Sequence, residues 1–158
     1  MISKLFYLFS LVLFFTIPVN SQAQQGTAGV ITLEDALTIA DAAEERAGQD
    51  NWTVVIAVVD SGGHLITLRR IDGTQIGSIN FAIEKARSSV YFKRPTKVFE
   101  DAMDGGNNRM LGLSGAVPFE GGIPIEQNGQ IIGAVGVSGA TAEQDGIVAQ
   151  AGIDALQE

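Results

Sequence analysis

Residues 53–73 read TVVIAVVDSGGHLITLRRIDG, and this stretch decides the fold. Its first part, Thr53 to Asp60, is almost wholly β-branched or small and apolar, which is typical of a central strand covered on both faces. Ser61-Gly62-Gly63 supplies turn residues, and the alternation from Leu65 to Arg70 predicts the returning strand of a hairpin. Asp72-Gly73 then ends this strand in a second turn.

A second hairpin and several helices are predicted around this one. Strand patterns run from Gly122 to Glu126 and from Gln130 to Ser138, across an Asn128-Gly129 turn. Residues 105–122 are rich in Gly and Pro, which favours a loop. Helical patterns cover Thr32–Gly48, Ile76–Lys93, Thr96–Met103 and Thr141–Leu156. Because there is no regular βαβ repeat, the sequence predicts an α+β fold, an antiparallel sheet with helices packed on it.

Capping signals mark the ends of two of these helices. Thr32 and Asp35 have the spacing of a capping box, and Gly48 is predicted to end the first helix. Thr96 follows Pro95 and is predicted to cap the short third helix.

The first 23 residues have the order of a secretory signal peptide. Lys4 precedes an apolar run from Leu5 to Ile17, and Ser21-Gln22-Ala23 resembles a cleavage site. The run is too short to cross a hydrocarbon core of ~30 Å, so we expect cleavage after Ala23 and no membrane insertion after processing. The alternative is an uncleaved anchor. We therefore expect a periplasmic or secreted protein with a disordered stretch at 24–30 and one domain at 31–158.

Composition excludes several classes of function. The chain has no cysteine, which removes disulfides, thiolate metal sites and cysteine nucleophiles. Its net charge is −8, and loss of Lys4 would make it more negative. A surface of this sign repels nucleic acid and anionic membranes.

Four blocks of sequence, in order, resemble the HbpS/GlcG family, which also includes the C-terminal domain of PduO-type cobalamin adenosyltransferases. The blocks are VVDSGGHLITLRRIDG at 58–73, AIEKARSS at 82–89, GGIPIEQNGQIIGAVGVSGA at 121–140 and DGIVAQAGIDAL at 145–156. The resemblance implies a profilin-like fold with a central antiparallel sheet of about five strands. It further implies a homo-oligomer, haem or a related tetrapyrrole as the small-molecule ligand, and a sensor protein as a further partner.

His64 is the only histidine, and it follows the turn of the first predicted hairpin. A neutral imidazole there could bind haem iron or another metal, although a lone histidine in a turn is more often merely solvated. Met103, Met110 and Tyr91 are the alternative or additional axial ligands, and each of these residue types more often serves in packing.

Basic and glycine residues complete the predicted binding site. Arg70, Arg94 and Arg109 could receive haem propionates or a small organic acid, and their alternative role is ion pairing with nearby acids. Gly121 and Gly122 would let a ligand or a neighbouring subunit approach the backbone closely.

The signals for catalysis are weaker than those for binding. One histidine cannot form a two-histidine metal site, and no GxSxG motif surrounds Ser114 or Ser138. Asp60, Asp72 and Glu84 could serve as acid or base, although any acidic protein carries such residues on its strands and helices. The sequence thus favours an exported ligand-binding protein. The alternatives are an enzyme or accessory protein for a small organic acid, or a structural oligomeric module.

Overall fold

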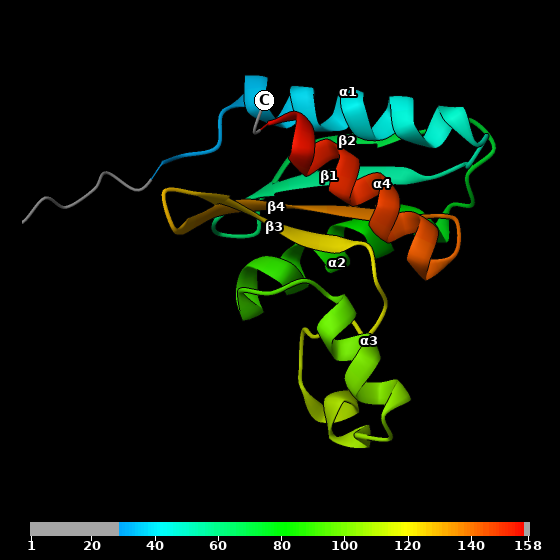
Figure 1. Ribbon diagram of the computed structural model, residues 1–158, viewed down its shortest axis with the longest axis vertical. Coiled ribbons are helices and arrows are strands. Elements are labelled where there is room, and N and C mark those ends of the chain that lie inside the picture. The colour runs from blue at the N-terminus through cyan, green and yellow to red at the C-terminus, as the bar shows by residue number, and fades with distance from the viewer. Residues whose placement is uncertain (1–28, 157–158) are drawn as a thin grey trace, which may run out of the picture.

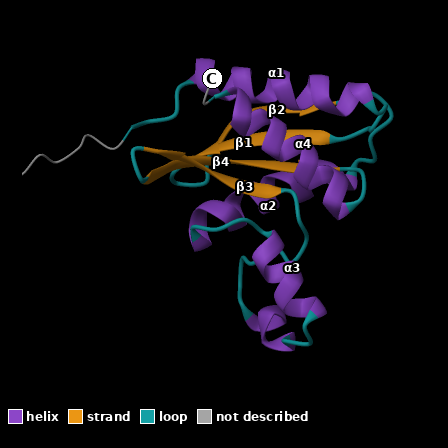
Figure 2. Cartoon of the chain, viewed as in Figure 1, coloured by secondary structure: helices purple, strands orange, loops and turns teal. Residues whose placement is uncertain are grey.

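The computed structural model describes residues 29–156, so the predicted signal peptide and most of the stretch at 24–30 lie outside the described residues. Four strands form one antiparallel sheet in the order β2-β1-β4-β3 (Figures 1 and 2). The strands are β1 Val55–Asp60, β2 Leu65–Arg70, β3 Gly122–Gln127 and β4 Gln130–Ser138. The helices are α1 Leu33–Gln49, α2 Gly77–Phe92, α3 Lys97–Asp104, the 3₁₀ helix η1 Asn108–Gly112 and α4 Ala142–Ala155.

Strand β1 lies in the middle of the molecule, as its sequence predicts. Five of its six residues are fully buried, and it pairs with β2 on one side and β4 on the other. Ile56 and Val58 face the layer formed by α1 and α4, whereas Val55 and Ala57 face α2. This alternation explains why the strand carries apolar residues at consecutive positions rather than at every second one.

The molecule therefore has three layers. Helices α1 and α4 cover one face of the sheet, and α2 covers the other (Figure 1). Residues 97–116, which comprise α3, η1 and the loop that follows, form an arm that projects from the α2 side. Only Phe99 within the arm is buried, so the arm contributes little to the main core.

The expected count of about five strands is wrong, because the sheet has four. The connection between α3 and β3 forms η1 and irregular loop rather than a further strand. Its glycines and its proline, at residues 105–122, explain this outcome, since neither residue type supports a strand interior.

Two capping predictions also need correction. Helix α1 continues through Gly48 to Gln49, and Asn51, at φ 54°, supplies the left-handed residue after it. Thr96 has helical φ and ψ angles and makes no side-chain cap. Its hydroxyl accepts a hydrogen bond from the N–H of Gly122 instead (2.9 Å), which fastens the base of the arm to β3. The capping box of Thr32 and Asp35 is confirmed.

Candidate functional site

The candidate site begins at the turn between β1 and β2. Oδ1 of Asp60 accepts hydrogen bonds from the backbone N–H groups of Gly62 (2.8 Å) and His64 (2.9 Å). Gly63 adopts a φ of 80°, a left-handed conformation that glycine accepts without steric cost. These contacts fix the backbone conformation of the turn and therefore the position of the His64 Cα.

The imidazole of His64 is oriented by the same carboxylate. Nδ1 lies 3.2 Å from each oxygen of Asp60. Hydrogen bonds, first among them the one from the His64 backbone, hold the pKa of Asp60 below its ordinary value. Because an ionised carboxylate only accepts hydrogen bonds, Nδ1 of a neutral His64 carries the proton and Nε2 keeps its lone pair. The side chain is 82 % exposed, so Nε2 is available to a ligand.

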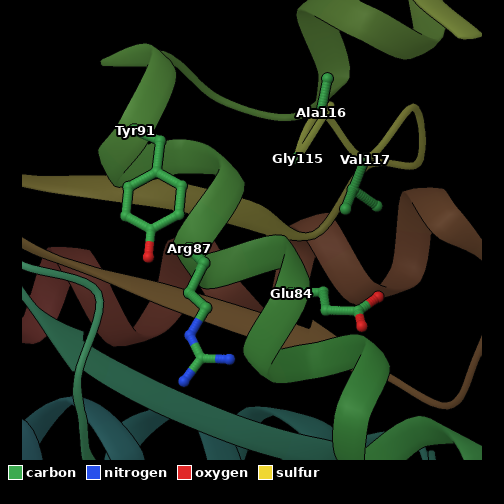
Figure 3. A pocket seen from close by; sticks show the side chains of 6 residues that line it. All are labelled: Glu84, Arg87, Tyr91, Gly115, Ala116 and Val117. Carbon is green, nitrogen blue, oxygen red and sulfur yellow. The ribbon is translucent and has the colours of Figure 1, made fainter. Parts of the chain in front are cut away.

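A cavity of about 340 Å³ lies next to this turn (Figure 3). Helix α2 forms one wall with Glu84, Arg87 and Tyr91, and residues 115–117 form the other. Nε of Arg87 donates a hydrogen bond to the carbonyl of Gly63 (2.9 Å). The Tyr91 hydroxyl also lies against Gly63, where a Cβ would be only 2.7 Å from it. The cavity and the His64 turn are thus direct neighbours.

The cavity offers polar groups beside an apolar wall. Figure 3 shows Arg87 and the hydroxyl end of Tyr91 extending to the same side of α2, while Glu84 extends away from them. Within residues 29–156 Arg87 forms no ion pair, which leaves its terminal nitrogens as donors for an anionic ligand. Ala116 and Val117 supply apolar surface on the opposite wall.

Two buried contacts anchor α2, and the first of them ties it to the opposite wall of this cavity. The N–H of Val117 donates to Oγ of Ser88 on α2 (3.1 Å), which ties the loop to the helix. Nζ of Lys85 donates to Oδ2 of Asp145 on α4 (2.8 Å), and these side chains are only 2 % and 3 % exposed. Burial lowers the pKa of Lys85 and raises that of Asp145, while the opposite charge of the partner counteracts both shifts.

The structure does not bring the predicted binding residues into one site. Arg70 lies at the opposite end of β2 from His64, and its guanidinium donates to the carbonyl of Thr74 (2.9 and 3.1 Å). Arg94 follows α2 and donates to the carbonyl of Phe92 (2.9 Å). The other candidates on helices lie at Arg109 and Met110 on η1, Met103 on α3 and Tyr91 on α2. Of these, Tyr91 lines the cavity beside His64.

Gly121 and Gly122 are buried, and groups of the same chain approach them closely. A Cβ on Gly121 would lie 2.9 Å from Nζ of Lys85, and one on Gly122 would collide with the carbonyl of Lys85 and lie 2.7 Å from Oγ of Ser89. The absence of side chains here lets β3 pack against α2 and lets Lys85 pass the sheet edge to reach Asp145.

Sequence reasoning missed Arg87 and the wall at Val117. A signal for Arg87 was present, because Glu84, Arg87 and Tyr91 are spaced i, i+3 and i+7 on the second predicted helix and therefore share one face. Nothing in the sequence indicated that residues 115–117 would fold back against that face.

No group of three or more His, Asp or Glu side chains in residues 29–156 is placed to hold a metal ion. None of the helices in this range combines the length and apolar character needed to cross a membrane.

Comparison with known proteins places this geometry in a family. The family model for haem degrading proteins of the HbpS-like type matches residues 31–154. The protein GlcG of Escherichia coli K12 is 39 % identical over 112 residues, which cover 71 % of this chain and 84 % of GlcG. The crystal structure of a PduOC–heme complex superimposes with a TM-score of 0.73 at 30 % identity, covering 80 % of this chain and 95 % of that one.

The crystal structure of HbpS agrees equally well. Its TM-score is 0.73 at 31 % identity, and the superposition covers 80 % of this chain and 89 % of HbpS. The match to the family model extends over nearly all of the described residues. The chain therefore belongs to the HbpS-like family.

Proposed function

We propose that this protein is an exported haem-binding protein in which Nε2 of His64 binds the iron beside the cavity at α2. The observation that carries the proposal is the pairing of His64 with Asp60 next to Arg87. A carboxylate that accepts a hydrogen bond from Nδ1–H fixes the tautomer and raises the basicity of Nε2, as in many metal-binding histidines. The heme complex of the similar PduOC supports the choice of ligand.

The residues present fit the chemistry of haem. The terminal nitrogens of Arg87 suit a propionate, and Ala116 and Val117 suit the apolar porphyrin surface. Tyr91 brings a phenol to the same edge of the cavity. When bound, haem would supply an iron centre for redox chemistry or ligand exchange, while the protein supplies the axial imidazole and the surrounding polarity.

The cavity is small for a ligand of this size. Its volume of about 340 Å³ lies near the lower end of the range for ligand pockets, about 300–1,000 Å³. One chain would therefore enclose only part of a porphyrin. We therefore propose a homo-oligomer in which a neighbouring subunit covers the rest of the porphyrin. The proposed role is that of a haem scavenger, a haem carrier or an accessory of a sensor protein.

Titration with haemin tests the binding claim. We expect residues 24–158 to give a saturable Soret shift, and His64→Ala to weaken binding by about tenfold or more, through loss of an iron ligand. Tyr91→Phe serves as a matched variant that keeps His64. An equal shift in wild type and His64→Ala would show that another residue binds the iron. The absence of any saturable shift would exclude haem as the ligand.

Export is supported by the sequence of residues 1–23. Expression of the full chain in a bacterial host followed by osmotic shock tests it. We expect the protein in the periplasmic or culture fraction with a new amino terminus near Gln24. An intact amino terminus in the cytoplasmic fraction would contradict export.

A second candidate is binding of a small organic acid at Arg87. The volume of the cavity and the free terminal nitrogens of this residue favour it. Calorimetry with a panel of 2-hydroxy acids tests it, and Arg87→Met should abolish any binding observed. If none of these acids binds, the second candidate is contradicted.

A further inference from the structure

A groove separate from the haem cavity lies between α3 and α4. It consists of two cavities of about 470 and 330 Å³ that share Lys97, Glu120 and Ile147. Neither cavity shares a lining residue with the one at Arg87. Each half of the groove has a different chemical character.

One half is strongly acidic. Five carboxylates line it, and Lys97 is its one basic lining residue. Nζ of Lys97 lies 2.8 Å from Asp101 and 3.8 Å from Glu120, so its charge is already shared between two acids. The remaining carboxylates are Glu100, Asp104 and Glu143. This half of the groove therefore attracts positive charge.

Glu120 stands at the junction of the two halves. Its side chain lies over Gly146 of α4, where an added Cβ would be 2.7 Å from Cγ of Glu120. Burial raises the pKa of this carboxyl, and Glu100 and Asp101 add to the shift while Lys97 opposes it. A further cation at this point would stabilise the ionised form.

The other half of the groove is largely apolar. Pro95, Ile123 and Ile147 line it together with the bare backbone of Gly122 and Gly146. The Ile147 side chain is 40 % exposed, although α4 otherwise turns its apolar residues to the core. An aliphatic or aromatic side chain placed here would lie next to Glu120.

The ligand that suits this combination is an organic cation rather than a metal ion. Within residues 29–156 no three carboxylates converge closely enough to coordinate a metal. Spread carboxylates beside an apolar hollow instead match Lys or Arg side chains that alternate with an apolar anchor.

We propose that the α3–α4 groove docks a basic, amphipathic peptide segment of a partner protein. Its apolar anchor occupies the hollow at Ile123 and Ile147, and its cationic side chains face Glu120 and the acidic half. This surface is independent of the haem cavity, so a partner can bind with or without haem.

Fluorescence anisotropy with a short labelled peptide that alternates Lys or Arg with Leu tests the proposal. We expect saturable binding that weakens by about fivefold or more in Glu120→Gln and in Glu143→Gln, because each removes one charge that faces the peptide. Ile147→Ser should weaken binding through loss of the apolar contact. Glu45→Gln on α1 makes the same charge change far from the groove and should leave binding unchanged.

The probes distinguish the proposed docking from its alternatives. A peptide of equal charge with Ser in place of Leu should bind weakly, and an acidic peptide should not bind. Equal binding by the Ser-containing peptide, or equal weakening by Glu45→Gln, would show attraction to the net charge alone and overturn the proposal. Competition by Mg²⁺ at constant ionic strength would reveal a metal site and would also overturn the proposal. Circular dichroism confirms that each variant is folded.

Discussion

Nζ of Lys85 on α2 donates a 2.8 Å hydrogen bond to Oδ2 of Asp145 on α4, and both side chains are almost completely buried. The two helices cover opposite faces of the sheet, so this ion pair crosses from one layer to the other. It passes Gly121, whose missing side chain leaves the space that the ammonium occupies.

Breaking this pair should be costly. We expect Lys85→Met to lower the free energy of unfolding by about 3–5 kcal/mol, because it leaves the buried Asp145 carboxylate without an opposite charge. Lys85→Met combined with Asp145→Asn should recover most of the loss, since it removes both charges and keeps an oxygen that accepts from the N–H of Ala140. Urea denaturation measures both effects. Lys97→Met, at an exposed lysine, is the control and should change stability by less than about 0.5 kcal/mol. A Lys85→Met protein as stable as wild type would show that the pair does not hold the layers.

Gly122 should also be sensitive to substitution, although less so than the ion pair. An alanine Cβ would collide with the Lys85 carbonyl, so Gly122→Ala should destabilise by about 1–3 kcal/mol through overpacking. Gly112→Ala is the matched control, because nothing lies within 4 Å of the Cβ it would add. Thermal unfolding compares them. If Gly122→Ala instead keeps full stability and loses only ligand binding, the glycine lets a ligand approach the backbone, which is one of the two roles predicted from the sequence.

Arg87 should matter more for haem binding than the arginines predicted from sequence. We expect Arg87→Met to weaken haemin binding by about tenfold, which corresponds to the loss of one charge-assisted hydrogen bond of about 1.5 kcal/mol. Arg94→Met, at a residue that does not line the cavity, should leave the affinity unchanged. The reverse order of effects in a haemin titration would place the ligand near Arg94.

The pH dependence of the turn should follow Asp60. Because the folded protein holds the pKa of Asp60 below its ordinary value of 3.8, the ionised carboxylate contributes stability above that value. The contribution is lost as the pH falls through the lower, folded pKa. Asp60→Asn should therefore be less stable than wild type near neutral pH, and the difference should disappear in strong acid. Thermal unfolding over a pH series measures it, and a difference that stays constant with pH would contradict the assigned charge state.

Most of the fold could be predicted from local sequence patterns. The apolar run of β1, the Asn128-Gly129 turn and the Thr32 capping box each predicted an element that the structure contains. These signals depend on residues close together in the chain. The role of Thr96 could not be predicted in this way, because its hydroxyl accepts a hydrogen bond from Gly122, which lies 26 residues later in the chain.

The candidate site was predicted less completely for the same reason. His64 could be recognised from residue type alone, but its Asp60 partner and the hydrogen bond from Arg87 to Gly63 depend on how β1, β2 and α2 are brought together. Arg69 and Arg70 are consecutive residues of β2, and the alternation of side chains along a strand correctly predicts that they point to opposite faces of the sheet. Arg69 pairs with Asp41 and Glu44 of α1, while Arg70 turns to Thr74.

Chemical rescue of His64 tests the central claim most directly. In His64→Gly the imidazole is lost but the space beside Asp60 remains, so added imidazole should restore the wild-type Soret and resonance Raman spectra of the haem-bound protein. Asp60 should be needed for this rescue, and Asp60→Asn combined with His64→Gly should respond weakly. If His64→Gly instead keeps the wild-type haem spectrum before any imidazole is added, His64 does not bind the iron and the account of this site is wrong.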